Sequence, residues 1–228
     1  MERNFSLTTA AVEFHLQQRD SGGNCGQKTI FLHGLGGDLS TWDDVWSQLD
    51  PAYPALRYDL RGFGQSRSKS DVSFNHGEDL LAIMESLNIE RANVVGVSMG
   101  GAVALNFALN YPERLGKLIL ISPGMVAWEW SDAWKGLWQS IVAHARNGEM
   151  SVARELWWQH PLFATTRQSP AAQHLHDSIL RYSGQQWIAD YQRPELPDVD
   201  RLYMLNVPTL LLTGGRDLDD FRLMAELL

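Results

Sequence analysis

Cysteine is almost absent from this sequence: Cys25 is the only one among 228 residues. A single thiol cannot close an intrachain disulfide or form a thiolate metal cluster, so both kinds of site are excluded. Cys25 lies in the stretch DSGGNCG, whose composition predicts a hairpin turn. Nothing in that stretch would activate the thiol, and we expect no catalytic role for it.

Long apolar runs and runs of positive charge are also missing. No stretch reaches the roughly 18 apolar residues that a membrane span needs, and the N-terminus lacks the basic segment and apolar core of a signal peptide. Acidic residues outnumber basic ones by 27 to 19, which gives a net charge of −8, and the lysines and arginines are scattered. We therefore expect no nucleic-acid or membrane partner, and a cytoplasmic location.

The sequence does contain an alternation of apolar strands and amphipathic helices. Residues 5–18 predict one or two half-exposed strands at a sheet edge. Almost continuously apolar strands, typical of a parallel sheet buried on both faces, are predicted at 28–34, 54–62, 92–98, 116–122 and 207–215. Helices are predicted at 40–49, with Ser40 or Thr41 as cap, at 76–89, and from 99 until Pro112 stops the helix. This order predicts an α/β fold with a doubly wound, mostly parallel sheet and right-handed crossovers.

Residues 123–200 break this alternation and contain no convincing strand. Helical stretches are predicted at about 127–147, 150–158 and 171–191, and seven of the nine tryptophans lie here. We interpret the segment as a helical cap over the C-terminal edge of the sheet, where open α/β folds bind ligands. The predicted domains are a first core part at 1–122, the cap at 123–200 and a second core part at 201–228.

The pentapeptide GVSMG at residues 96–100 follows an apolar strand and precedes a helix. This context indicates a nucleophile elbow, in which Ser98 would have a strained backbone and an exposed hydroxyl. Small residues at Gly96 and Gly100 would let neighbouring backbone pass close by. The start of the following helix supplies free N–H groups and positive dipole that stabilise an oxyanion. The alternative is a buried serine in a tight turn.

A second glycine-rich stretch, FLHGLGG at 31–37, also ends a predicted strand. It fits the loop of an oxyanion hole, because glycines such as Gly34 let backbone approach a reacting oxygen. The two expected N–H donors are those of Leu35 and Met99. His33 is expected to orient this loop rather than to transfer a proton.

These motifs resemble the α/β-hydrolase family, in its serine esterase and lipase-like branch. The matching segments cover residues 28–122 and 207–217 in the family's order: FLHGLGGDLSTWDDV, RYDLRGFGQSRS, VVGVSMGGAVALNFALNYPERLGKLILISP and VPTLLLTGGRD. The resemblance implies a triad in the chain order serine, acid, histidine. Ser98 matches the nucleophile, and Asp217, in the turn after the last predicted strand, matches the acid.

Other acids near the matched position are expected to be uninvolved. Asp219 and Asp220 follow Asp217 closely but should begin the next helix. The family's other acid position, after the strand LILI, is occupied by Ser122 and Pro123, which cannot serve as the acid.

The most consequential absence is that no histidine follows Asp217. The resemblance implies a base a few tens of residues after the acid, whereas only eleven residues follow Asp217 and none is histidine. Without a base, a serine hydroxyl is a weak nucleophile near neutral pH. Our expectation is that the sequence lacks a C-terminal strand, helix and histidine. The alternatives are a non-catalytic binding protein, or a base in the cap, for which the candidates are His144, His160, His174 and His176.

The chemistry of a serine with an oxyanion hole is acyl transfer to water, and it requires no metal or organic cofactor. Trp130, Trp134 and Trp138 are spaced to share a helix face, and with Trp157 they are candidates for an aromatic roof. We therefore expect a small-molecule substrate: a small, largely uncharged ester, thioester or lactone. The oligomeric state is not indicated.

Two other functions stay open. WWQHPLFA and GGRDLDDF are similar to stretches of a lyase of the menaquinone pathway that eliminates pyruvate. This resemblance implies a lyase with the same triad. That lyase needs an arginine four residues after the nucleophile for its polyanionic substrate, and this position is Ala102, although Arg154 or Arg167 could partly substitute. The remaining alternative is a ligand-binding or regulatory protein on the same scaffold.

Overall fold

The computed structural model describes residues 2–20, 26–68, 72–193 and 195–228, so Cys25 and most of its predicted turn lie outside the described residues. The described chain forms one eight-stranded sheet with the order β1-β2-β4-β3-β6-β7-β8, and β5 pairs with β2. The strands are β1 (Glu2–Thr8), β2 (Val12–Arg19), β3 (Thr29–Leu32), β4 (Ala55–Tyr58), β5 (Arg67–Ser68), β6 (Ala92–Val97), β7 (Leu115–Ile121) and β8 (Thr209–Leu212).

The pairing pattern confirms a mostly parallel, doubly wound α/β fold. β4, β3, β6, β7 and β8 pair in parallel, whereas β1, β2 and β5 add antiparallel pairs at one edge. The predicted edge stretch at 5–18 is the β1–β2 hairpin. The two-residue strand β5 was not predicted, because it is too short to carry a pattern.

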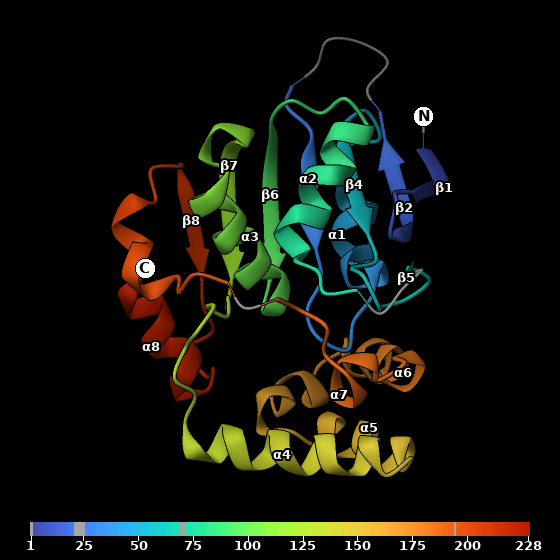
Figure 1. Ribbon diagram of the computed structural model, residues 1–228, viewed down its shortest axis with the longest axis vertical. Coiled ribbons are helices and arrows are strands. Elements are labelled where there is room, and N and C mark those ends of the chain that lie inside the picture. The colour runs from blue at the N-terminus through green and yellow to red at the C-terminus, as the bar shows by residue number, and fades with distance from the viewer. Residues whose placement is uncertain (1, 21–25, 69–71, 194) are drawn as a thin grey trace.

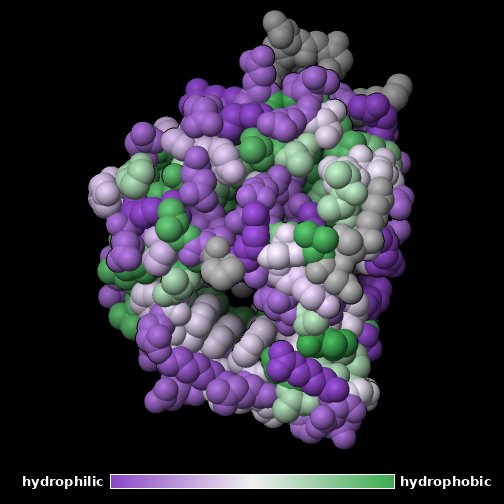
Figure 2. Space-filling model, in the orientation of Figure 1, coloured by the Kyte–Doolittle hydropathy of each residue, from purple (hydrophilic) through white to green (hydrophobic). Residues whose placement is uncertain are grey.

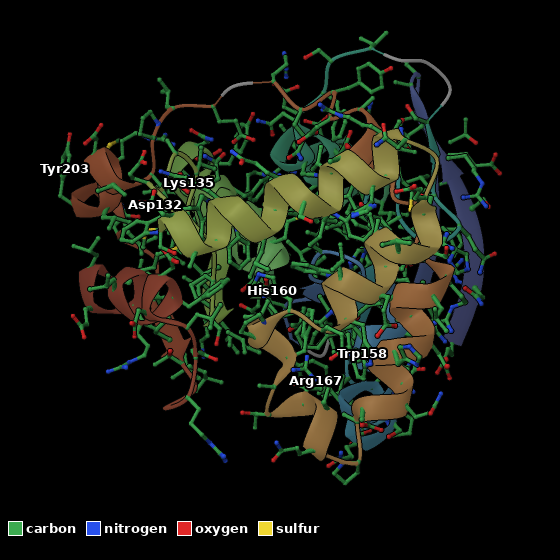
Figure 3. All side chains as sticks on the ribbon, turned by 90° about the horizontal axis from the view of Figure 1, so that it is seen from below. Asp132, Lys135, Trp158, His160, Arg167 and Tyr203 are labelled. Carbon is green, nitrogen blue, oxygen red and sulfur yellow. The ribbon has the colours of Figure 1, made fainter. Side chains whose placement is uncertain are left out.

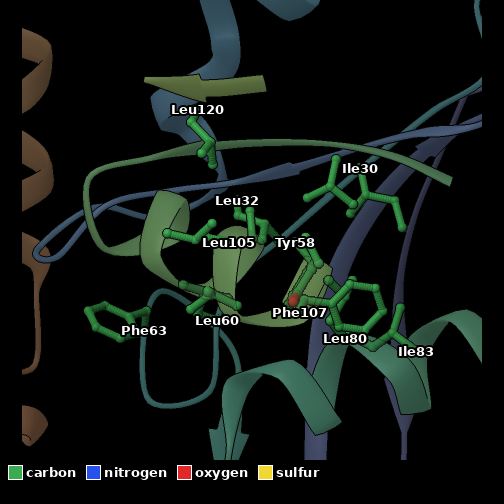
Figure 4. Packing of buried hydrophobic residues seen from close by; sticks show 14 of the residues in the cluster. Ile30, Leu32, Tyr58, Leu60, Phe63, Leu80, Ile83, Leu105, Phe107 and Leu120 are labelled. Carbon is green, nitrogen blue, oxygen red and sulfur yellow. The ribbon is translucent and has the colours of Figure 1, made fainter. Parts of the chain in front are cut away.

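Core helices cover both faces of the sheet (Figure 1). They are α1 (Asp43–Gln48), preceded by the 3₁₀ turn η1 (Leu39–Trp42), then α2 (His76–Ser86) and α3 (Met99–Asn110), with η2 (Pro112–Arg114) where Pro112 ends the helix. Apolar side chains of α2 and α3 pack against the strands on one face (Figure 4). Trp42 and Trp46 pack against Phe31 on the other. The predicted cap, Ser40 or Thr41, was wrong: Asp38 caps the 3₁₀ turn η1 by accepting the Ser40 N–H at 2.9 Å, and α1 starts after Trp42 without a side-chain cap.

The cap helices lie beyond the carboxyl ends of the parallel strands, below the sheet in Figure 1. They are α4 (Asp132–Arg146), α5 (Met150–Trp158), α6 (Ala172–Arg181) and α7 (Gln185–Ile188), with the 3₁₀ turns η3 (Pro161–Phe163) and η4 (Thr166–Gln168) between α5 and α6. The predicted helix at 171–191 is two helices, because Gly184 takes a left-handed conformation with φ 74°. Trp130 precedes α4 rather than lying in it, because Ser131 caps that helix.

The chain returns to the core through η5 (Val199–Met204), β8 and α8 (Asp219–Leu227). The prediction of a strand buried on both faces was wrong for β8, in which Leu210 and Leu212 are about half exposed. Its neighbour on one side is β7, and no described strand pairs with its other side. No helix in the described ranges combines the length and the apolar character that a membrane crossing needs.

Candidate active site

Ser98 stands on a sharp turn between β6 and α3. Its φ of 53° and ψ of −116° lie in a region that non-glycine residues rarely adopt. Two glycines make the turn possible. A Cβ at Gly96 would lie 2.2 Å from the Gly100 carbonyl oxygen, and one at Gly100 would lie 2.4 Å from the Leu32 carbonyl oxygen. The predicted elbow geometry is therefore present.

Backbone hydrogen bonds hold Ser98 from both sides. Its N–H donates to the Ile121 carbonyl at 3.0 Å, and its carbonyl accepts from the Gly124 N–H at 3.0 Å. Gly34 passes close by, because a Cβ there would lie 3.3 Å from the Ser98 Cβ. The Ser98 hydroxyl makes no hydrogen bond within the described part of the chain, so it is free to meet a bound molecule.

A cavity of about 350 Å³ opens in front of Ser98, between the core and the cap. Figure 2 shows a hollow between these two parts. The lining residues come from the elbow, the oxyanion loop, the cap and α8: Leu35, Ser98, Met99, Ala102, Gly124, Met125, Trp130, Trp134, Lys135, Trp138, Gln139, Trp157, Gln186, Asp190, Gln192 and Phe221. A site of this size and mainly apolar lining suits a small organic molecule.

Aromatic rings form the roof of this cavity, and all four predicted tryptophans line it. Trp130 and Trp134 stack with ring centroids 4.2 Å apart and an interplanar angle of 16°. Trp157 meets Trp134 and Trp138 edge to face, each at 6.3 Å. Stacked and edge-to-face contacts of this kind rigidify a wall beyond what apolar burial provides.

The predicted oxyanion loop follows β3 and reaches the same cavity. Leu35 and Met99 both line it, and their backbone N–H groups have no hydrogen-bond acceptor among the described residues. His33 is fully buried beside them. Its Nδ1–H donates to the Gly34 carbonyl at 2.8 Å, and its Nε2 accepts from the Leu60 N–H at 3.0 Å. Burial lowers the pKa of His33, so the ring stays neutral and both nitrogens are engaged.

Asp217 lies in the turn between β8 and α8. Its Oδ2 accepts hydrogen bonds from the Ser122 hydroxyl at 2.6 Å, the Gly214 N–H at 2.8 Å and the Thr213 hydroxyl at 3.2 Å. Its Oδ1 has no hydrogen-bond partner in the described chain. Three donors therefore orient one oxygen and leave the other able to accept a further hydrogen bond.

The two neighbouring acids have other contacts, as expected for the start of a helix. Asp219 is exposed and pairs loosely with Arg222 at 3.4 Å. Asp220 is buried and accepts from the Ser131 N–H at 3.0 Å, from its hydroxyl at 2.7 Å and from the Trp128 ring N–H at 3.1 Å. Burial raises the pKa of Asp220, but these hydrogen bonds outweigh it and leave the pKa lowered.

None of the four cap histidines lines the cavity. His144 bonds Glu149, His174 bonds the Ser40 carbonyl, and His176 packs on the Trp158 ring. His160 comes nearest, because its ring contacts the lining residues Trp134 and Trp157. Burial lowers its pKa to about 4, which makes it a weak base.

The polar residues of the cavity lining, Lys135 among them, were not predicted from the sequence. Lys135 lies on the first turn of α4 beside Asp132 (Figure 3), and its pKa is raised chiefly by Glu129. Phe221 of α8 and Ser122 after β7 were also missed. Phe221 had a weak signal as an apolar residue in the first turn of a predicted helix, whereas the contact between Ser122 and Asp217 joins residues 95 positions apart.

The described residues contain no cluster of His, Cys, Asp and Glu that could hold a metal ion.

Comparison with known proteins places this geometry in a family. The family model of the alpha/beta hydrolase fold matches residues 30–218. A 2-hydroxy-6-oxo-6-phenylhexa-2,4-dienoate hydrolase of Comamonas testosteroni is 41% identical over 110 residues, which are 43% of this chain and 37% of that protein. The 3-oxoadipate enol-lactonase 1 of Acinetobacter baylyi is 26% identical over 190 residues, which are 82% of this chain and 70% of that protein.

Solved structures agree in fold. An esterase from Thermogutta terrifontis superposes with a TM-score of 0.78 at 22% identity, covering 99% of this chain and 86% of the esterase. The enol-lactonase of Burkholderia xenovorans gives 0.74 at 21% identity, covering 90% and 78%. Several curated relatives are matched over less than half of their own length. The family match covers most of this chain, and the chain belongs to the α/β hydrolase fold family.

Proposed function

We propose that this protein hydrolyses a small, largely apolar ester, thioester or lactone through an acyl-enzyme on Ser98. The observation that carries the proposal is the position of Ser98. It occupies a strained elbow with an unbonded hydroxyl, at the floor of an aromatic-walled cavity. Strain at such a turn is maintained where it exposes a reacting group, and Gly96 and Gly100 are the residues that permit it.

Charge that develops on the substrate oxygen would be stabilised by two backbone donors. The N–H groups of Leu35 and Met99 lack acceptors within the described ranges and belong to residues that border Ser98 in the cavity. The Met99 N–H also lies at the positive end of α3. Donors that are already in place require no reorganisation during the reaction. In this proposal His33 and Gly34 shape the loop.

Asp217 is proposed as the acid that orients a histidine base and stabilises the protonated form of its ring. Its Oδ2 is saturated by donors and its Oδ1 is unbonded, so a histidine N–H would have one defined acceptor. A carboxylate in this role keeps the imidazole in the tautomer that can take the serine proton. The proton removed from Ser98 would then pass to the leaving alkoxide or thiolate.

The aromatic roof supports a substrate with an apolar acyl part. The enol-lactonase similarity favours a lactone or ester, and it extends over most of this chain. A second candidate is a phenyl-substituted oxo-dienoate, favoured by the higher identity to the Comamonas hydrolase and by the ring-lined walls. The decrease in the dienoate's own ultraviolet–visible absorbance on incubation with the chain would test this candidate directly.

The lyase alternative gains no support from the cavity. No arginine is among its lining residues, and Ala102 stands at the position that the lyase needs for one. Arg154 donates to the Tyr182 carbonyl, and Arg167 donates to the carbonyls of Trp158 and His160 in the cap (Figure 3). Those guanidinium groups are therefore engaged in cap structure.

The test uses p-nitrophenyl butyrate and a fluorophosphonate, with imidazole added as the base that the described residues do not supply at Ser98. We expect a burst of p-nitrophenolate approaching one equivalent per chain, and a fluorophosphonate adduct on Ser98 by peptide mass spectrometry. Ser98→Ala should abolish both, whereas Ser47→Ala, at an exposed serine of α1, should retain both. A wild-type chain with neither burst nor adduct, even with imidazole supplied as the base, would refute the hydrolase proposal and favour a ligand-binding role.

A further inference from the structure

The segment that carries Leu35 is anchored to the core on one side. After β3, His33 joins it to Leu60, and the Gly37 N–H donates to the Gly34 carbonyl at 3.1 Å. The Leu39 N–H donates to the buried Asp59 carboxylate at 2.7 Å. These contacts fix the two ends of residues 34–39 but leave the middle, at Gly36, to other partners.

Helix α6 of the cap contacts the same segment with one face. His174 Nε2 lies 2.9 Å from the Ser40 carbonyl oxygen, and the Ser178 hydroxyl donates to the Gly36 carbonyl at 3.4 Å. Arg181 donates to the Asp38 carboxylate at 3.1 Å. Residues 174, 178 and 181 are spaced by four and three, so they share one face of the helix. Their partners are alternate residues of the segment that follows Leu35.

Gly36 itself is packed beneath the cap. Its φ of 78° requires glycine, and a Cβ there would lie 2.8 Å from the Trp157 ring nitrogen and 3.7 Å from the Ile179 side chain. Trp157 is buried and also lines the cavity in front of Ser98. The segment is therefore held between α6 and the aromatic roof that would contact the substrate.

We propose that α6 is a latch that positions the oxyanion hole from the cap. The latch residues are Ser178 and Arg181, supported by His174, and they act through the backbone of residues 36–40 on the orientation of the Leu35 N–H. A cap that lifts to admit substrate loosens this segment, and a cap that closes restores it. Catalytic competence is thereby coupled to cap closure. The inference rests on the proposed function, because it assigns the Leu35 N–H to the developing oxyanion.

The first experiment measures the segment without measuring activity. Amide hydrogen exchange of peptides spanning residues 33–41 is compared in the wild type, Ser178→Ala, Arg181→Gln and the double variant. Arg181 is more than half exposed and its ion pair adds little to global stability, so the fold should persist. We expect exchange in this segment to rise at least about threefold in the double variant, as a local opening would produce. Gln173→Ala, on another face of α6, is the control and should leave it unchanged.

The second experiment separates positioning from binding. With a p-nitrophenyl ester we expect kcat of the double variant to fall about three- to tenfold at nearly constant KM, because a misplaced donor weakens the transition state and not the ground state. The affinity for an alkyl boronic acid, which forms a tetrahedral anion on the serine, should fall by the same factor. Global unfolding in urea serves to show that the variants are folded.

Two results would overturn the latch: unchanged exchange in residues 33–41, or faster exchange with kcat and boronate affinity intact. If the wild-type chain forms no acyl-enzyme even with imidazole supplied as the base, the proposed function fails. In that case the exchange measurement still decides whether α6 holds the segment, so the two failures are distinguishable.

Discussion

At the scale of single residues, the site depends on residues whose backbone is held in unfavourable conformations. Ser98 and Ser122 both have positive φ, at 53° and 40°, and they end the neighbouring strands β6 and β7. The Ser122 hydroxyl donates to Oδ2 of Asp217, which lies in the turn after the next strand, β8. Residues in such conformations cost of order 1–3 kcal/mol each, and here they coincide with the proposed nucleophile and with the support of the proposed acid.

Removing the Ser122 hydroxyl should weaken catalysis more than substrate binding. Ser122→Ala deletes the shortest of three hydrogen bonds to a carboxylate, worth about 1.5 kcal/mol, which corresponds to roughly a tenfold loss in kcat. Ser122→Gly is the matched variant, because it deletes the same hydroxyl but relaxes the positive φ. Steady-state kinetics of both, with imidazole as the added base, should show the same loss in kcat. An unchanged kcat would mean that Asp217 needs no such support.

Imidazole should accelerate ester hydrolysis by this chain. The Ser98 hydroxyl has no base bonded to it within the described residues, and the cavity of about 350 Å³ can hold a small heterocycle beside an ester. An added base can take the serine proton and so raise the acylation rate. Burst rates are measured against imidazole concentration, with Ser98→Ala to subtract direct imidazole catalysis. No acceleration above that background would indicate that a base is already engaged.

At the scale of elements, α8 ties the cap to the core. Asp220 at its first turn accepts three hydrogen bonds from residues 128–131, and Ser131 is the cap residue of α4. Phe221, one residue later, contacts both Trp130 and Trp134. One turn of α8 therefore fixes the start of the cap and also completes the wall of the cavity.

Asp220→Ala should destabilise the fold, and Asp219→Ala should not. The first change leaves three donors without their acceptor at a buried position, a loss of about 2 kcal/mol. The second removes an exposed carboxylate with one long contact, and we expect no measurable change. Urea unfolding of the two variants gives the comparison. Equal stabilities would mean that α8 does not hold the cap through this carboxylate.

At the scale of the whole molecule, buried neutral histidines make stability dependent on pH. His76 is 1% exposed, neither ring nitrogen has a hydrogen-bond partner in the described chain, and burial lowers its pKa to about 3. His160, with a pKa of about 4, acts in the same direction. The unfolded chain takes up these protons near pH 6.5 and the folded chain does not. The free energy of unfolding therefore falls as pH decreases from about 6.5 toward 3.

His76→Leu should flatten this dependence. One proton fewer is taken up on unfolding, so the loss of stability with falling pH should shrink by up to about 1.4 kcal/mol per pH unit. Near neutral pH the variant should be as stable as the wild type or more so, because it removes two unbonded buried nitrogens. Urea unfolding across about pH 4 to 7 tests both points. Parallel curves for the two proteins would show that His76 is not the titrating group.

The sequence was sufficient for features whose signals are local. The elbow, the glycine loop and the succession of strands and helices along the chain follow from short motifs and from periodicity. Features that depend on distant contacts were missed or misplaced. Asp38 caps the 3₁₀ turn that precedes the first helix, Gly184 divides a helical stretch, and β8 lies at an exposed edge despite its apolar sequence. The contacts of Ser122 and α6 join residues 95 to 143 positions apart, and no pattern along the chain encodes them.

The clustering of indole rings at the cavity also gives the molecule an intrinsic optical reporter. Trp130 and Trp134, stacked at 4.2 Å, are close enough for their electronic transitions to couple, and Trp138 and Trp157 complete the same wall. A compound that enters the cavity changes the spacing of these indole rings and their contact with solvent. Quenching of native fluorescence and a shift in near-ultraviolet circular dichroism would therefore report occupancy without a label, and would permit screening of compound libraries before any turnover assay is established.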